Sequence, residues 1–246
     1  MRRGEPAVDL PLVACLGDSI TRGNASADYV RILARRHRGR ARFHNGGVNG
    51  DLAHHLAQRL DPVLALRPDV VTVLIGTNDV NAHLDEAWRA RYARTLPPGS
   101  EPTLAWYAEH LDLILQRLTA ATGTRVAVLT LPPIGEDLTS RMNDLVRAYN
   151  AALVDVSARH GVPVLPLHER LVALLPAQAR PPAYEGSVPA IMTAVAQHLL
   201  LRRSWDAIAR RRGLTLLTDH LHLGDTAAAV IADLVGGFAL GDDTTP

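Results

Sequence analysis

The sequence predicts a single α/β domain in which helices cover both faces of a parallel sheet. Short apolar runs alternate with helix-length stretches, and such strand–helix alternation builds parallel βαβ units. The runs lack strict apolar–polar alternation, which is typical of strands buried on both faces. No fixed-period repeat and no glycine- or serine-rich linker divides the chain. We therefore expect one domain over residues 8–238, followed by a flexible C-terminal tail at 239–246.

Five apolar runs are candidate strands, and the one at residues 41–44 is the weakest. In chain order they are residues 12–16, 41–44, 70–75, 126–131 and 162–167. Stretches with an apolar period near 3.6 lie between them and predict helices. These stretches are residues 28–37, 52–66, 104–121 and 138–160. Ser26 and Asp51 are candidate N-caps for the first two helices.

A long segment at about 169–217 interrupts this rhythm, and we interpret it as a helical insertion. Four prolines break its first half, and two helix-like pieces follow near 190–201 and 204–212. Residues 188–201 place several apolar side chains near one helical face. Two interpretations remain open for this face: packing on the main core, or a lid or acyl-binding wall over an active site.

Composition excludes several classes of function. All 26 basic residues are arginine, so a P-loop lysine, a Schiff-base lysine and a Ser–Lys dyad are impossible. The single cysteine, Cys15, excludes an internal disulfide. The near balance of 26 basic and 25 acidic residues argues against a general nucleic-acid binder. The apolar run at 10–16 is too short for a signal peptide or a membrane span, so we expect a cytoplasmic protein without an integral membrane segment.

Positive charge is nevertheless gathered in two places. The run 31–42 holds six arginines and no acid, and residues 170–213 hold seven arginines against two acids. A solvated helix end is the simplest explanation of the first run. The arginine-rich insertion could contact an anionic substrate or a membrane surface, which the salt dependence of kcat/KM would test.

Polar motifs follow three of the candidate strands, where ligands bind in open parallel sheets. The first strand runs into Gly-Asp-Ser-Ile-Thr, which places Ser19 at a tight exit toward a helix. The second is followed by Asn-Gly-Gly-Val-Asn-Gly-Asp, whose glycines, Gly50 among them, let backbone N–H groups approach a ligand. The third ends in Gly-Thr-Asn-Asp, where the Asn78 amide can donate to a substrate oxygen. Each motif taken alone is equally compatible with a turn or a helix cap.

A fourth motif, Asp-His-Leu-His, lies near the C-terminus. Asp219 and His222 are three residues apart, which in a turn lets the carboxylate hold the imidazole Nδ1–H. His220 lies between them and should point elsewhere. The alternative is a metal site from His220 and His222, but no third or fourth ligand is evident. We expect no metal and no organic cofactor.

The order of these four blocks over nearly the whole chain resembles the GDSL/SGNH hydrolase family. The resemblance implies a flavodoxin-like three-layer α/β/α sandwich with a five-stranded parallel sheet. It also implies a catalytic triad with Ser19 as nucleophile, His222 as general base and Asp219 as its orienting partner. The implied oxyanion hole consists of the backbone N–H groups of Ser19 and Gly50 and the side-chain amide of Asn78.

Three hypotheses for the function follow. The first is a serine esterase or lipase-type enzyme that cleaves a small-molecule or lipid ester through an acyl-enzyme. The second is an acyltransferase that uses the same site and passes the acyl group to a sugar or alcohol. The third is a non-catalytic binding domain on the same fold. It predicts a missing triad element, and none is missing here.

Overall fold

The computed structural model of the protein describes residues 10–177, 180–184 and 186–241. Five parallel strands form one sheet in the order β2-β1-β3-β4-β5. The strands are β1 (Leu12–Gly17), β2 (Arg42–Gly47), β3 (Val70–Leu74), β4 (Arg125–Leu129) and β5 (Val164–Leu165). The weak candidate at 41–44 is thus a real edge strand, and the predicted five-stranded parallel α/β architecture is confirmed.

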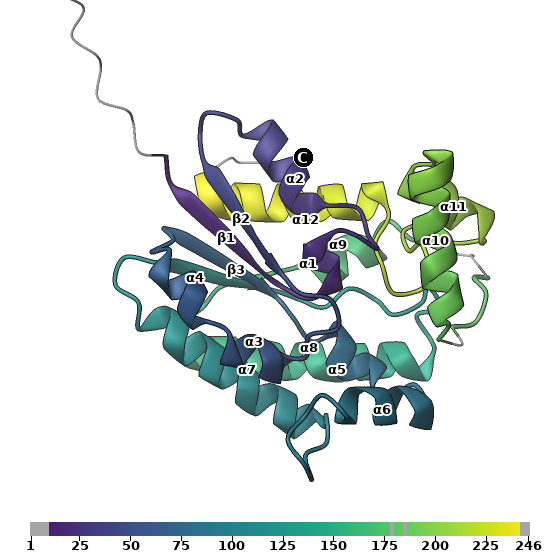
Figure 1. Ribbon diagram of the computed structural model, residues 1–246, viewed down its shortest axis with the longest axis horizontal. Coiled ribbons are helices and arrows are strands. Elements are labelled where there is room, and N and C mark those ends of the chain that lie inside the picture. The colour runs from purple at the N-terminus through teal and green to yellow at the C-terminus, as the bar shows by residue number, and fades with distance from the viewer. Residues whose placement is uncertain (1–9, 178–179, 185, 242–246) are drawn as a thin grey trace, which may run out of the picture.

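Burial explains why the central strands read as continuous apolar runs. All five residues of β3 and the last five of β1 are buried, because helices cover both faces of the sheet. Figure 1 shows the three layers, with α2, α9 and α12 on one face and α3, α4, α7 and α8 on the other. The covering helices are α2 (Tyr29–Arg36), α3 (Ala53–Gln58), α4 (Asp61–Ala65), α7 (Leu104–Thr119), α8 (Arg141–Arg159), α9 (Leu167–Val172) and α12 (Asp225–Leu240).

Three details differ from the expected elements. The helix expected at 52–66 is divided into α3 and α4, because Pro62 cannot donate a backbone hydrogen bond and its ring crowds the carbonyl of Gln58, the last residue of α3. Asp28, rather than Ser26, caps α2 by accepting from the Arg31 N–H at 2.8 Å. Asp51 caps no helix, since its carboxylate instead binds Arg59 at 2.6 Å.

The remaining helices gather at the carboxyl end of the sheet (Figure 1). They are α1 (Ser19–Arg22), α5 (Thr77–Asn81), α6 (Glu86–Ala93), α10 (Val188–Leu201) and α11 (Trp205–Arg211). The two helices α10 and α11 belong to the insertion, and α10 is mostly exposed, with Ala194 its one fully buried residue. Helix α6 was not expected from the sequence.

The last helix, α12, ends at Leu240 and so includes the first two positions of the expected C-terminal tail. Residues 242–246 lie outside the described part of the chain. Among the described helices, none combines the length and the apolar character needed to cross a bilayer.

Candidate active site

The end of β1 brings Ser19 to the carboxyl edge of the sheet. Asp18 caps α1 by accepting from the Ile20 N–H at 2.9 Å, and Ser19 is the first residue of that helix. Gly17 is required here, because a Cβ at this position would lie 2.3 Å from the Leu74 carbonyl oxygen. The tight exit therefore places the serine beyond the sheet edge, where its largely buried side chain lines a cavity.

Ser19, His222 and Asp219 form one continuous chain of hydrogen bonds. The Ser19 Oγ lies 2.9 Å from His222 Nε2, and His222 Nδ1 lies 2.8 Å from Asp219 Oδ2. The other carboxylate oxygen of Asp219 accepts from the backbone N–H groups of Leu221, at 3.1 Å, and His222, at 2.8 Å. The hydrogen bonds within this turn fix the side chains of Asp219 and His222 relative to each other. Ser19 lies 203 residues from His222 in sequence, so the fold brings it to this turn.

His220 points away from this chain. Its backbone has a φ of 71°, which lets the turn between Asp219 and His222 close. Its ring stacks against Tyr184 of the insertion, with ring centroids 5.5 Å apart. The two histidines of the metal alternative therefore have separate partners. No group of three or more potential metal ligands is found within the described residues.

The surroundings of His222 and Asp219 shift the pKa values of both residues. Burial alone would lower the pKa of His222, but the Asp219 carboxylate and its hydrogen bond outweigh burial and raise it above the ordinary value. Burial alone would raise the pKa of Asp219, yet the charge of His222 and the hydrogen bonds it receives lower it. Burial also raises the pKa of Asp18 to about 7. The site thus stabilises an imidazolium–carboxylate pair, which is the state that a general base must reach.

The amide of Asn78 is held in one orientation beside Ser19. Tyr92 donates its hydroxyl to Asn78 Oδ1 at 2.7 Å, and Asn78 Nδ2 donates to the Asp51 carbonyl at 2.9 Å. Asn78 Oδ1 thus already accepts a hydrogen bond, and Nδ2 uses one of its two hydrogens. The second hydrogen of the NH₂ group remains to be donated to a ligand. Gly50, which lines the same cavity as Asn78, has a φ of 81°, a conformation that favours glycine.

All the residues expected at the site converge on one place. Ser19, Gly50, Asn78 and His222 line the same cavity of about 210 Å³, and Asp219 lies behind His222. The rest of the wall is mainly apolar, and most of it comes from α6 and α10. It includes Ala25, Trp88, Arg91, Tyr92, Val188, Ile191, Met192 and Leu221. Sequence reasoning identified the α10 face as a candidate wall but missed α6, which carries no clear apolar stripe.

Arg59 is a positioning residue that the sequence did not reveal. Its guanidinium donates to the carbonyl oxygens of Gly17 and Gly46, each at 2.9 Å, and its Nε binds Asp51 at 2.6 Å. It therefore ties the ends of β1 and β2 to the loop that carries Gly50. In a chain with 26 basic residues, all arginine, nothing local distinguished this arginine from the others.

Glu136 is a second residue of this kind. Its buried carboxylate accepts from the consecutive backbone N–H groups of Thr215, Leu216 and Leu217 at 2.7–2.9 Å. It thereby anchors the segment that leads into Asp219. The only available signal was its position in the loop that follows β4, at the same sheet edge as the other motifs.

Comparisons with known proteins agree with this geometry. The family model for the GDSL-like Lipase/Acylhydrolase family matches residues 15–229. No curated protein matches the sequence. An acetyl xylan esterase, AlAXEase, superposes with a TM-score of 0.65 at 17% identity, covering 93% of this chain and 100% of that one. Axe2, an acetylxylan esterase from Geobacillus stearothermophilus, gives 0.63 at 16% identity over 92% of both chains.

A third similar structure is LAE5, described as an α/β hydrolase enzyme from the metagenome of Lake Arreo in Spain. It gives a TM-score of 0.59 at 22% identity, over 92% of this chain and 94% of that one. At these identities the structural likeness establishes the fold. The family match covers most of the chain and confirms the resemblance found in the sequence. The chain belongs to the GDSL-like lipase/acylhydrolase family and is a carboxylic ester hydrolase.

Proposed function

We propose that the protein is a serine esterase that hydrolyses short-chain carboxylic esters through an acyl-enzyme on Ser19. The observation that carries this proposal is the unbroken hydrogen-bond chain from Ser19 through His222 to Asp219, with spacings of 2.9 and 2.8 Å, in a cavity that Gly50 and Asn78 also line. Such a chain is the arrangement that converts a serine hydroxyl into a nucleophile.

The geometry supports the following sequence of steps. Ser19 Oγ attacks the ester carbonyl carbon while its proton moves to His222 Nε2, and Asp219 stabilises the imidazolium. The N–H groups of Ser19 and Gly50 and the Asn78 amide donate to the developing oxyanion. His222 then passes the proton to the leaving alkoxide, and the ester C–O bond breaks. Water attacks the acyl-enzyme with His222 again as base, which releases the acid and restores Ser19.

The Ser19→Ala variant tests this proposal. We expect kcat on an activated ester such as 4-nitrophenyl acetate to fall by a factor on the order of 10⁴ to 10⁶, because the members of a triad act as a unit. A serine-directed phosphonate should add its mass to the wild type and leave the variant unmodified. Near wild-type turnover by a folded Ser19→Ala variant would refute the assignment. Product analysis with added alcohols separates hydrolysis from acyl transfer.

The size of the cavity supports a short acyl group. Its 210 Å³ is bounded on the α10 side by Val188, Ile191 and Met192, so this helix acts as a wall for the acyl chain. We expect kcat/KM to fall with acyl length across a graded ester series. Ile191→Ala should move the optimum toward longer chains, whereas Leu200→Ala, on the exposed side of the same helix, should not. An identical length profile in both variants would contradict the wall.

A peripheral contact of the insertion with an anionic surface is a further part of the proposal. Leu199, Leu200 and Leu201 are exposed at the end of α10, and the exposed Arg202 follows them directly. Apolar side chains beside cations suit an anionic lipid surface. Co-sedimentation with anionic vesicles, lost in Leu200→Glu and absent with neutral vesicles, is the expected result. No co-sedimentation by the wild type would remove this part. A cytoplasmic location remains a prediction.

A further inference from the structure

A second, wider groove adjoins the catalytic cavity, and the proposed reaction makes no use of it. It has a volume of about 530 Å³ and lies between α6 and the start of α10. Trp88, Arg91 and Val188 line both spaces, so the groove continues outward from the wall of the catalytic cavity. A substrate bound at Ser19 could therefore extend into it.

Two arginines set the charge of this groove. Arg91 and Arg94 both line it, three residues apart at the end of α6. Neither lies within 4.0 Å of a carboxylate oxygen of any described residue, whereas Arg89 on the same helix pairs with Glu86 at 3.9 Å. The Arg91 guanidinium instead lies over the Trp88 ring, 5.5 Å from its centroid.

One carboxylate, that of Asp85, also lines this groove. Its Oδ1 caps α6 by accepting from the Trp88 N–H at 2.8 Å. The two guanidinium groups outnumber this single carboxylate, so the charged side chains of the lining sum to +1 and favour an anionic ligand. A guanidinium presents paired N–H donors that match the oxygens of a carboxylate or a phosphate.

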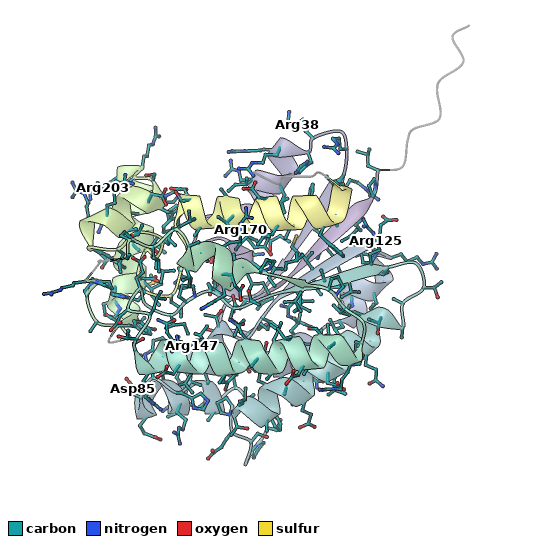
Figure 2. The ribbon with its side chains drawn as sticks, turned by 180° about the vertical axis from the view of Figure 1, so that it is seen from behind. Arg38, Asp85, Arg125, Arg147, Arg170 and Arg203 are labelled. Carbon is teal, nitrogen blue, oxygen red and sulfur yellow. The ribbon has the colours of Figure 1, made fainter. Side chains whose placement is uncertain are left out.

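The arginines of the insertion do not take this role. None of the seven, all of them described residues, lines the catalytic cavity or the groove. In Figure 2, Arg203 lies at the upper left of the molecule, whereas Asp85, which lines the groove, lies at the lower left. Sequence reasoning placed a possible anion contact in the insertion, but the positive side chains beside the active site come from α6.

We propose that this groove, through Arg91 and Arg94, binds a carboxylate or phosphate on the alcohol part of the ester. The inner cavity beside Ser19 is small and mainly apolar, which suits the acyl group, so the alcohol part extends outward. The substrate class is therefore a short-chain acyl ester of an anionic alcohol, such as a sugar acid or a sugar phosphate. This inference rests on the proposed function and specifies its substrate.

The test compares matched esters. Four substrates are needed: 4-nitrophenyl acetate, the acetate of a nitrophenol that carries a carboxylate, the acetate of a nitrophenol that carries a phosphate, and the succinate monoester of 4-nitrophenol, whose charge lies on the acyl side. The measured quantity is the ratio of kcat/KM for the charged ester to kcat/KM for the neutral one. We expect Arg91→Gln with Arg94→Gln to lower this ratio about tenfold for the charged alcohol, which corresponds to about 1.4 kcal/mol. The effect should lie in KM.

Arg89→Gln is the control, because Arg89 lies on the same helix but lines neither space. Its ratio should equal that of the wild type. Added salt should lower the wild-type ratio and leave that of the double variant unchanged. An unchanged ratio in an active Arg91→Gln, Arg94→Gln variant would overturn this inference alone. An equal fall of the ratio in Arg89→Gln would also overturn it, and so would a fall of kcat/KM that is confined to the succinate ester. Wild-type activity in Ser19→Ala would instead overturn the proposed function. Comparison of kcat/KM for the carboxylate-bearing ester with kcat/KM for the phosphate-bearing ester identifies the preferred anion.

Discussion

Removing the hydroxyl of Tyr92 should weaken catalysis by loosening Asn78, while the Tyr92 ring remains in the wall of the catalytic cavity. In Tyr92→Phe, Asn78 Oδ1 loses the donor that lies 2.7 Å away, while the bond from Asn78 Nδ2 to the Asp51 carbonyl at 2.9 Å remains. The amide thus keeps one of its two restraints. Loss of a complete oxyanion donor costs a factor of about 10² to 10³ in kcat. Since the donor here is loosened rather than removed, we expect kcat to fall by a factor of about 5 to 20, with KM little changed.

The effect on stability can be separated from the effect on catalysis. A buried acceptor left without its donor costs about 1–3 kcal/mol, so Tyr92→Phe should also lower the free energy of unfolding. Tyr149→Phe is the matched control, because its buried hydroxyl pairs with His83 Nε2 at 2.9 Å rather than with Asn78. This control should show a similar loss of stability with wild-type kcat.

A double-mutant cycle decides whether Tyr92 acts through Asn78. If it does, adding Tyr92→Phe to Asn78→Ala should cause no further loss of kcat on 4-nitrophenyl acetate. Steady-state kinetics of the four proteins, with denaturant unfolding of each, supplies the data. Full additivity of the two losses in kcat, or an equal loss of kcat in Tyr149→Phe, would refute the reasoning.

Two further predictions concern the triad and its supports. Because His222 must be neutral to accept the Ser19 proton and its pKa is raised, kcat/KM should fall as the pH drops through a value above the ordinary histidine pKa of about 6.5. In Asp219→Asn the loss of the carboxylate should move this acid limb to lower pH and reduce kcat by about 10⁴. Asp18→Asn should move the limb less, because the Asp18 charge is the smallest of the contributions that raise the His222 pKa. A limb that moves as far in Asp18→Asn as in Asp219→Asn would instead assign it to the Asp18 carboxyl, whose pKa is about 7. Glu136→Gln should lower the free energy of unfolding by about 3 kcal/mol, because three backbone N–H groups lose their charged acceptor. Calorimetry should then show a fall in Tm of roughly 6–12 °C. Glu169→Gln is the control, because the Glu169 carboxylate accepts a hydrogen bond from the Thr130 hydroxyl and not from backbone N–H groups. A fall in Tm for Glu136→Gln no larger than that for Glu169→Gln would contradict this role.

Local sequence signals sufficed for the sheet and for the residues that line its carboxyl edge. The buried strands are apolar runs with no alternation, and three of them are followed by the polar motifs that hold Ser19, Gly50 and Asn78. The carboxyl ends of parallel strands meet at one edge of a sheet, so these three motifs are expected to lie together. The Asp219–His222 pair follows no strand of the sheet, and its place in the site is implied by the resemblance to the family. Even the division of the helix at 52–66 was visible in principle, since Pro62 lies within it.

The rest was decided by tertiary packing. Arg59 is defined by three carbonyl and carboxylate partners from separate segments, and Glu136 by backbone groups about 80 residues away. Neither set of partners can be recognised from the residues next to Arg59 or Glu136 in the sequence. The outer groove likewise exists only because α6 and α10, about 100 residues apart, lie side by side. The sequence by itself predicted which groups perform the proposed chemistry, because the motifs that carry them are local and stand in the order of a known family. Only the structure showed what holds these groups in place and which cavities lie beside them, because those contacts join distant segments.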